Sequence, residues 1–442
     1  GRSPQAWTPD TFKGMDSVPM RGWMSVSVPG AIAGWVALSK RYGKLPFADL
    51  LAPAIDIAER GYMVTPIIAS QWARAVPILQ NQPGYAEHFM PHGRAPLPGE
   101  LFRNPAQAES LRLIAESEGE SFYRGQLAAR IVAHAKAHGG LMTGIDLAAH
   151  VADWVEPIRM GYRGYEVAEI PPNGQGIAAL MALGMLDDFD LKALGPNHPD
   201  YWHLSIEAMK LAFRDVHAQV ADPEYMNVSA SAMLDRDFLK SRAKLIDLKR
   251  AQDFSPSAEL RGGTVYLNAA DESGLMVSLI QSNYYGFGSG VVVDGISLQN
   301  RAYGFTLDPA HPNCVAGGKR PFHTIIPGFI LKDGQPVGPF GVMGGHMQPQ
   351  GHMQTAIRMI DFGENPQAAL DGPRFRVEQG LEVDLEPWTP ADVRAELAAR
   401  GHKLKENKDS YMDFGSGQII WKTADGYITG SDPRRDGCAV GF

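Results

Sequence analysis

The spacing of apolar residues predicts helices through most of the first 260 residues. Between residues 45 and 64, and again between 201 and 220, apolar side chains recur three or four positions apart, which is the pattern of an amphipathic helix. Residues 165 to 170 instead alternate like a strand. A Pro-Pro-Asn-Gly-Gln-Gly turn at 171 to 176 then leads into an apolar helix over 177 to 186.

The pattern changes near residue 250, where short β-rich runs replace helical spacing. Residues 265–269 and 275–281 flank the turn sequence Ala-Asp-Glu-Ser-Gly and predict a hairpin. We expect strands at 291–293 and 329–331 to extend the sheet of this hairpin. The last hundred residues predict helices at 350–360 and 390–400 and terminal strands at 417–421 and 426–430. Helix-rich sequence followed by β-rich sequence predicts an α+β architecture.

Composition excludes several classes of protein. The 442 residues are 44% hydrophobic and 20% charged, as expected of a globular enzyme. A formal net charge of −8 argues against nucleic-acid binding, which needs cations to neutralise phosphates. The longest strongly apolar stretch, at 176–186, is too short to cross a bilayer, so we expect no membrane partner.

The chain begins Gly-Arg-Ser-Pro rather than with Met, which suggests that upstream residues were trimmed or not included. The compartment, cytoplasmic or periplasmic, therefore stays open. Cys314 and Cys438 are far apart and lack a Cys-x-x-Cys motif, so they give no support for a zinc or redox site; one disulfide or two unpaired thiols both remain open. His346 and His352 fit no metal motif either, and no cofactor or metal is predicted.

The most informative local sequence is Gly262-Gly263-Thr264. Two glycines before a Thr that opens a strand give a backbone flexible enough for the Thr hydroxyl to reach the carbonyl of Gly263. Cleavage there would leave Thr264 with a hydroxyl nucleophile and a free α-amine whose ordinary pKa, about 7.7 to 8.0, suits a general base. On this tripeptide alone, a glycine turn before a strand threonine is the favoured explanation of the sequence.

Several ordered motifs extend this hypothesis, and together they resemble the γ-glutamyltransferase (γ-glutamyltranspeptidase) family over nearly the whole chain. In the first part they are Ser-Val-Pro-Gly-Ala-Ile-Ala-Gly-Trp at 27–35, Tyr-Gly-Lys-Leu-Pro at 42–46, Leu-Ala-Pro-Ala-Ile at 51–55, Glu-Ala-Met-Lys-Leu-Ala-Phe at 207–213 and Asp-Pro at 222–223. In the second part they are Asp271, Gly274, Gln-Ser-Asn-Tyr at 281–284, Gly-Phe-Gly-Ser-Gly at 286–290, Lys-Arg-Pro at 319–321, Gly344-Gly345, Pro-Arg-Phe at 373–375 and Ser-Asp-Pro-Arg at 431–434.

The resemblance implies a four-layer αββα sandwich of the N-terminal-nucleophile hydrolase type. It implies a large-subunit part at residues 1–263, N-terminally incomplete, and a small subunit at 264–442 that starts at the nucleophile, with the two forming one intertwined domain. Thr264 takes the position of the processed nucleophile, and the processing site lies between Gly263 and Thr264. Ser282 stands where the family places a second hydroxyl; a strand serine on a polar face is the alternative. Gly344 and Gly345 match the pair whose backbone N–H groups bind the oxyanion.

The sequence departs from the family at the residues that hold a substrate's α-amino group. Where γ-glutamyl enzymes have Asn, Gln and a second Asp, this chain has Tyr284, Arg301 and Gly304. The acidic partner for an ammonium is therefore missing. A guanidinium in its place favours a carboxylate or a neutral polar group.

The carboxylate-binding end is altered less. The family's Ser-Ser becomes His323-Thr324, which keeps hydrogen-bonding capacity, and Arg2 stands near the place of an arginine that pairs with that carboxylate. The segment between residues 305 and 319 is also short, which leaves little chain for a lid loop over the site.

We therefore expect a self-processing amidohydrolase that acts on a small acyl-amide, with large and small subunits from one precursor and with a dimer of that heterodimer left open. The acyl group is γ-glutamyl or related, as in glutathione, with a glutaryl- or cephalosporin-type acylase as the alternative. A homologue that has lost catalysis and only binds is a third hypothesis, although Thr264 and the Gly344-Gly345 pair are intact.

Overall fold

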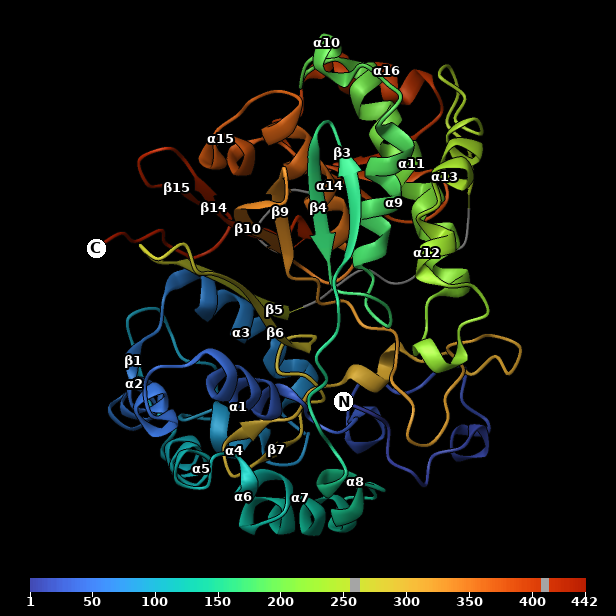
Figure 1. Ribbon diagram of the computed structural model, residues 1–442. Coiled ribbons are helices and arrows are strands. Elements are labelled where there is room, and N and C mark those ends of the chain that lie inside the picture. Colours follow the sequence, from blue (N-terminus) through green and yellow to red (C-terminus); the bar gives the residue numbers. More distant parts are fainter. Residues whose placement is uncertain (255–262, 407–412) are drawn as a thin grey trace. The chain divides into compact units, whose positions relative to one another are not determined.

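The computed structural model describes residues 1–254, 263–406 and 413–442, with Gly263 described by its backbone alone. The chain folds into two compact units (Figure 1). The first unit is Gly1–Trp154 with Asn283–Pro321, and the second is Val155–Ser282 with Phe322–Phe442. Each unit therefore contains chain from both sides of the Gly263–Thr264 bond. Among the described helices, none combines the length and the apolar character that a membrane crossing requires.

The first unit is mainly helical. Its helices enclose a core that includes Trp23, Ile114, Phe122 and Ile131, and the core also takes in Val291 from the 283–321 segment. Its elements are η1 (Pro9–Phe12), η2 (Trp23–Ser25), α1 (Ala31–Tyr42), α2 (Phe47–Arg60), β1 (Tyr62–Met63), α3 (Pro66–Leu79), α4 (Tyr85–Phe89), β2 (Leu101–Phe102), α5 (Pro105–Glu116), α6 (Glu120–Tyr123), α7 (Gln126–Ala137), α8 (Gly144–Ala148), β7 (Val292–Val293), β8 (Ile296–Ser297) and η4 (Arg301–Gly304).

The second unit is built on a six-stranded sheet with the order β15-β14-β10-β9-β4-β3. The β10–β14 and β4–β9 pairs are both antiparallel, and each joins strands from distant parts of the chain. The strands are β3 (Ile158–Tyr162), β4 (Tyr165–Glu169), β9 (Gly328–Lys332), β10 (Gln335–Met343), β14 (Ser416–Lys422) and β15 (Tyr427–Ser431).

Helices α9 (Gly176–Leu186), α11 (Pro199–Gln219) and α14 (Met347–Ile360) pack together beside this sheet (Figure 1). Every residue of α9 is buried, which explains why its sequence is apolar on all sides. The remaining elements of the unit are α10 (Leu191–Leu194), η3 (Pro223–Tyr225), α12 (Ala230–Met233), α13 (Arg236–Ala243), β5 (Gly263–Ala270), β6 (Met276–Tyr284, whose last two residues belong to the first unit), α15 (Pro366–Asp371), β11 (Phe375–Val377), β12 (Glu382–Leu385), α16 (Ala391–Ala399) and β13 (Lys403–Glu406).

Strand β5 and helix α14 lie on opposite faces of the six-stranded sheet. A Cβ placed on Gly341 would meet the ring of Tyr266 on β5 at 2.7 Å. The next residue, Val342, contacts Gly351 on α14, where an added Cβ would lie 2.6 Å from its side chain. Since consecutive residues of a strand point to opposite faces, the order of layers here is helix, sheet, hairpin strand.

The predicted hairpin and the predicted helices are confirmed, but one expectation about the sheets is wrong. The strands near 291 and 329 do not extend the hairpin's sheet: β5 pairs with β6, β7 pairs with β8 in the first unit, and β9 belongs to the six-stranded sheet. The sequence pattern identifies a strand, whereas its partner depends on how the chain returns through space. Cys314 and Cys438 are both free thiols.

Candidate active site

The β5–β6 hairpin brings Thr264 and Ser282 together. The Thr264 Oγ1 hydroxyl donates a hydrogen bond of 3.0 Å to Ser282 Oγ, and Thr264 is buried. One step along the hairpin, the Tyr266 hydroxyl and Ser278 Oγ are 2.9 Å apart. The turn that aligns the strands is closed by a hydrogen bond from Gly274 N to Asp271 O, with Gly274 at a φ of 85° that favours glycine.

The bond predicted for processing lies at the start of β5. Gly263 is the first residue of that strand, directly before Thr264. Gly262 lies outside the described residues.

Gly344 and Gly345 follow the end of β10, the strand that Tyr266 covers. Their φ angles are 137° and 61°, and a Cβ on Gly344 would lie 2.9 Å from Gly415 Cα, so this position requires glycine. The carbonyls point into the first turn of α14: Gly344 O accepts from Met347 N at 3.1 Å and Gly345 O from Gln348 N at 3.2 Å. Within the described chain neither glycine N–H donates a hydrogen bond, so both are available to an oxyanion.

His323 and Thr324 are joined to this glycine loop through Gln175. The Gln175 side chain donates from Nε2 to Thr324 O and to Gly345 O, both at 2.8 Å. Its backbone N–H donates to His323 O at 3.0 Å. The local sequence predicts only that Gln175 lies in a turn, because its partners in this contact lie far away in the chain.

The predicted head-group residues Tyr284 and Arg301 lie together in the first unit. The Arg301 guanidinium is buried and sits over the Tyr284 ring, 4.8 Å from its centre. Burial lowers the pKa of Arg301 to about 9, partly offset by Tyr284, which still leaves the group charged at neutral pH. Tyr285 and Tyr303 pack against Tyr284 and add two more aromatic rings.

Tyr284 also has an unusual backbone. Its φ of 76° lies in the left-handed region, which asparagine tolerates far better than a bulky side chain does. The family's Asn would therefore fit this backbone without strain. The Tyr side chain is held there at a cost in conformational energy, as is common for residues that line binding sites.

Arg2 contacts the segment that was predicted to be too short for a lid. Its Nη1 donates to Gly318 O at 3.0 Å. The segment is tied to itself, because Val315 N donates to Thr306 O at 3.0 Å and Lys319 Nζ to Cys314 O at 2.8 Å. Residues 305 to 319 thus form a compact loop within the first unit.

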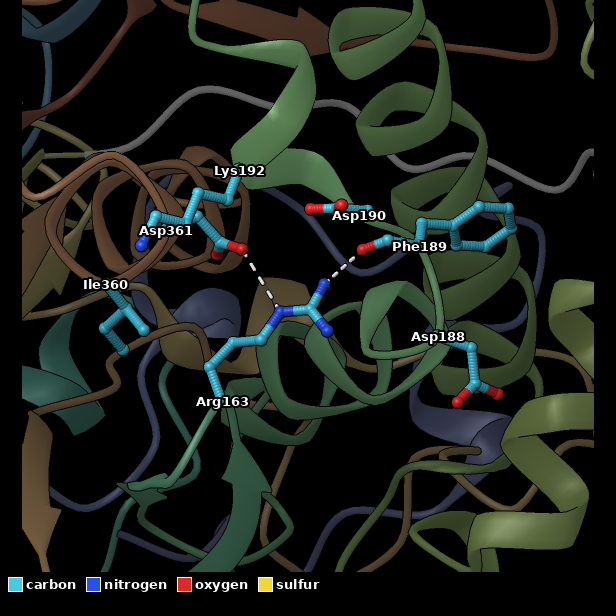
Figure 2. Close-up of a pocket in the computed structure, with 7 residues that line it drawn as sticks. All are labelled: Arg163, Asp188, Phe189, Asp190, Lys192, Ile360 and Asp361. Atoms are coloured by element: carbon cyan, nitrogen blue, oxygen red, sulfur yellow. Dashed lines mark hydrogen bonds and ion pairs between the residues drawn. The ribbon is translucent and has the colours of Figure 1, made fainter.

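A surface pocket of about 370 Å³ in the second unit contains none of the predicted site residues (Figure 2). Its central cation, Arg163, donates from Nε to Asp361 Oδ1 at 3.1 Å and from Nη2 to Leu186 O at 3.3 Å. Asp361 also accepts from the Tyr162 hydroxyl at 2.6 Å. Arg163 thereby closes the C-terminal end of α9, so the structure accounts for it without a ligand.

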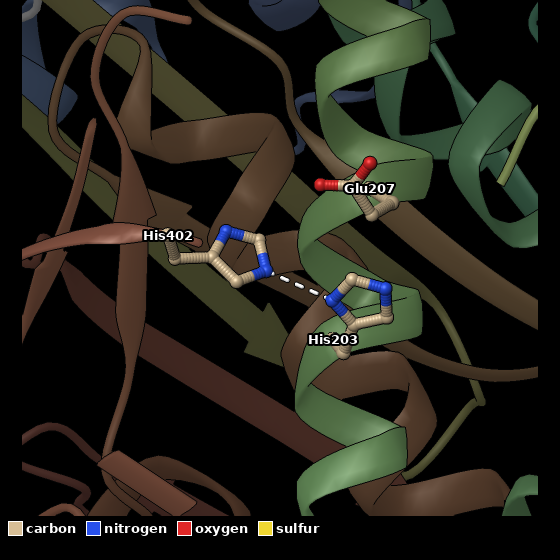
Figure 3. A group of neighbouring side chains, drawn as sticks. All are labelled: His203, Glu207 and His402. Carbon is tan, nitrogen blue, oxygen red and sulfur yellow. Dashed lines mark hydrogen bonds between the residues drawn. The ribbon is translucent and has the colours of Figure 1, made fainter. Parts of the chain in front are cut away.

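A buried polar group that the sequence analysis missed lies between α11 and His402 (Figure 3). The ligand-type atoms of His203, Glu207 and His402 all lie within 4.8 Å of one another. His203, Glu207 and Lys210 are spaced to share one face of α11, which is the signal that could have found them. Within this group Lys210 Nζ donates to Glu207 Oε1 at 2.8 Å and lies 3.4 Å from His402 Nδ1.

The hydrogen bonds in this group define the protonation of each ring. A carbonyl only accepts, so His203 Nε2 donates to Asp247 O at 2.8 Å and its Nδ1 accepts from His402 Nε2 at 2.9 Å. His402 Nδ1 is then the acceptor that faces Lys210. Burial, together with Lys210, lowers the pKa of His402 to about 2, and burial also lowers that of His203. Both rings are therefore neutral, and burial lowers the pKa of Lys210 as well, against the opposing effect of Glu207.

Comparison with known proteins shows which family the chain resembles. The model of the family described as gamma-glutamyltranspeptidase matches residues 1–442. A glutathione hydrolase-like YwrD proenzyme of Bacillus subtilis (strain 168) is 36% identical over 100% of this chain and 86% of its own length. An acylase ACY 1 proenzyme of Pseudomonas sp. (strain SE83) is 34% identical over 95% of this chain and 75% of its own.

A solved structure is similar over nearly the same extent. The cephalosporin acylase from Bacillus halodurans has 48% sequence identity and a TM-score of 0.94, with coverage of 99% of this chain and 83% of that one. The fold is therefore the α+β sandwich of the N-terminal-nucleophile hydrolases, and the proenzyme names of the relatives support a processed form with two subunits. This chain is an enzyme that belongs to the γ-glutamyltranspeptidase family.

Proposed function

We propose that Thr264 is the nucleophile of a self-processing amidohydrolase. The observation that carries the proposal is the 3.0 Å hydrogen bond between the Thr264 and Ser282 hydroxyls, on a strand that starts at Gly263. In processing, Thr264 Oγ1 attacks the carbonyl carbon of Gly263, the C–N bond breaks, and water hydrolyses the resulting ester. The products are residues 1–263 and 264–442, with a free α-amine on Thr264.

Turnover then uses the same hydroxyl. The α-amine of Thr264 takes the hydroxyl proton as Oγ1 attacks the acyl carbon of the substrate, and Ser282 orients the oxygen through its hydrogen bond. The N–H groups of Gly344 and Gly345 bind the oxyanion of the tetrahedral intermediate. The leaving amine departs with the proton, and water releases the acyl group from Thr264.

Incubation of purified precursor without added protease tests this proposal. We expect two fragments, with the smaller one starting Thr-Val-Tyr on N-terminal sequencing. Thr264→Ser should process and turn over more slowly, because a hydroxyl remains, while Thr264→Ala should do neither. Release of the same fragment by a folded Thr264→Ala protein would refute the role of Thr264.

For the acyl group, we propose a preference for acids without an α-ammonium, such as glutaryl, over γ-glutamyl. The buried Arg301 over Tyr284 and the Gly304 that replaces an acid support it. The likeness to a cephalosporin acylase supports it too. An ammonium near a guanidinium with no acid costs on the order of 1 to 3 kcal/mol, or about five- to more than a hundredfold in kcat/KM.

Paired assays of glutaryl-anilide and γ-glutamyl-anilide on the processed enzyme test the preference. The kcat/KM for glutaryl-anilide should equal or exceed that for γ-glutamyl-anilide. A strong preference for γ-glutamyl-anilide would mean that another residue supplies the partner of the ammonium, and the acylase proposal would fall while the Thr264 proposal stood.

A further inference from the structure

Gln175 connects three segments of the second unit through one buried side chain. It precedes α9 as its N-cap residue and is fully buried. Its Nε2 group lies 2.8 Å from both Thr324 O and Gly345 O. Since both partners are carbonyls, which only accept, the orientation of the amide is fixed by its surroundings.

The loop that Gln175 reaches is the one that most needs an external support. Gly344 and Gly345 have no side chains and occupy φ angles of 137° and 61°, so nothing within the pair restricts its peptide planes. Bonds to Met347 N and Gln348 N hold the two carbonyls from within the loop and helix. Gln175 adds a third bond, the shortest of the three, from a different part of the chain.

The same residue also fixes the segment that carries His323 and Thr324. Gln175 N donates to His323 O at 3.0 Å, and His323 N donates to Asn173 O at 2.9 Å. The turn at 173–175 is thus paired with 323–324 by its backbone. The Gln175 amide then ties this pair to Gly345, so one side chain sets how the predicted carboxylate-binding residues are spaced from the predicted oxyanion loop.

We propose that Gln175 is a positioning residue for the oxyanion loop, acting through Gly345. This inference rests on the proposed function, because it assumes that Gly344 and Gly345 bind the oxyanion. Loss of the amide releases the carbonyl side of Gly345 and lets its flanking peptide planes rotate. Loss of one oxyanion donor costs about a hundred- to a thousandfold in kcat, and we expect a displaced loop to cost about tenfold or more.

A buried glutamine elsewhere provides a matched control. Gln354 on α14 is also buried, and its Nε2 donates to two carbonyls, Gln350 O and Phe375 O, both at 3.1 Å. Within the described structure its side chain hydrogen-bonds to neither glycine of the loop and to neither His323 nor Thr324. A Gln→Met change at either position keeps the shape and removes two donated hydrogen bonds. At Gln354 it also removes Oε1, which accepts from Phe375 N at 3.1 Å, so this control should lose at least as much stability as Gln175→Met.

The first experiment compares Gln175→Met with Gln354→Met in the processed enzyme. We expect Gln175→Met to lower kcat about tenfold or more with KM nearly unchanged. Affinity for a boronic acid analogue of the acyl group, which places a hydroxyl at the oxyanion position, should fall by a similar factor. Gln354→Met should keep both values close to wild type, even where its melting temperature falls as far as that of Gln175→Met or further.

The second experiment uses Gln175→Glu, so that the test does not depend on one variant folding. An ionised Glu at position 175 has no donor for the carbonyls of Thr324 and Gly345, and its charged oxygen is repelled by them. A protonated Glu can donate one hydrogen bond to one of these carbonyls. The activity of Gln175→Glu relative to wild type should therefore rise as the pH falls, and Gln354→Glu should not share this trend. Wild-type kcat and boronate affinity in Gln175→Met, or a flat ratio in Gln175→Glu, overturns the role of Gln175. Failure of the proposed function is distinguished by an active Thr264→Ala enzyme, whatever Gln175 does.

Discussion

The residues proposed for chemistry and those proposed for recognition are built in different ways. In the second unit, Thr264, Ser282 and the Gly344–Gly345 loop depend on backbone geometry and on short hydrogen bonds between neutral groups. In the first unit, Tyr284 and Arg301 form a cluster of large side chains with a buried cation against a ring. Thr264 and the glycine pair match the family's motifs, whereas Tyr284 and Arg301 replace the family's residues.

This difference has a physical reason. An oxyanion hole needs backbone N–H groups at fixed positions, and few side chains are compatible with the φ angles that provide them. A head-group pocket needs only a complementary charge and shape, which one or two side chains can change without altering the backbone.

The largest expected effect comes from breaking the backbone of the glycine pair. Gly344→Ala should lower kcat about a hundredfold or more, because an L-residue is strained at a φ of 137° and its Cβ would meet Gly415 Cα at 2.9 Å, displacing the donors. Initial rates with the anilide substrate measure it. Gly426→Ala is the control, since its φ is 156° and the space around it is open. Equal activity in the two variants would contradict the oxyanion assignment.

The next effect sharpens the recognition side of the comparison. Arg301→Gln combined with Gly304→Asp restores the family's residues, so the ratio of kcat/KM for γ-glutamyl-anilide to that for glutaryl-anilide should rise about five- to a hundredfold. The rate of precursor processing should stay unchanged, because the reacting groups are untouched. An unchanged substrate ratio in a folded double variant would show that these two positions do not select the acyl group.

A smaller effect tests the buried polar network of the second unit. The pKa of His402 is about 2 in the folded protein, against an ordinary value of 6.5, so below pH 6.5 the unfolded chain binds a proton that the folded chain does not. The free energy of unfolding should therefore decrease as the pH is lowered below 6.5, by up to about 1.4 kcal/mol per pH unit from this residue. Urea unfolding at several pH values below 6.5 gives the free energy of unfolding as a function of pH. The slope of this free energy against pH should be shallower for His402→Gln than for wild type. The exposed His92→Gln should keep the wild-type slope; an equal slope in all three proteins would contradict the neutral, buried state of His402.

The smallest expected effect concerns the choice between water and an amine as the acceptor. Residues 305 to 319 are tied into a compact loop by the bonds of Lys319 and Val315, which leaves little chain for a cover. Glycylglycine should therefore raise product release only slightly, with hydrolysis dominant, as measured by chromatography of the acyl products. A large rise, with the transfer product in excess, would show that the acyl-enzyme is protected from water by other means.

The sequence by itself determined most of the elements and indicated Thr264 as the candidate nucleophile. Apolar spacing located α2, α9, α11 and α14, turn residues located the β5–β6 hairpin, and ordered motifs indicated Thr264 and the glycine pair. These features are readable because periodicity and turn chemistry are local, acting over a few residues.

Only the tertiary structure decided which distant residues meet. Gln175 reaches Gly345 across 170 positions, and His203 reaches His402 across 199. The assignment of β9 to the six-stranded sheet, and the position of Arg301 over the Tyr284 ring, were settled in the same way. A local pattern shows which face of an element is apolar, but the partner of a buried polar side chain depends on the packing of whole layers. Burial makes each unpaired hydrogen-bond donor costly, and it therefore selects the contacts that pair the donors.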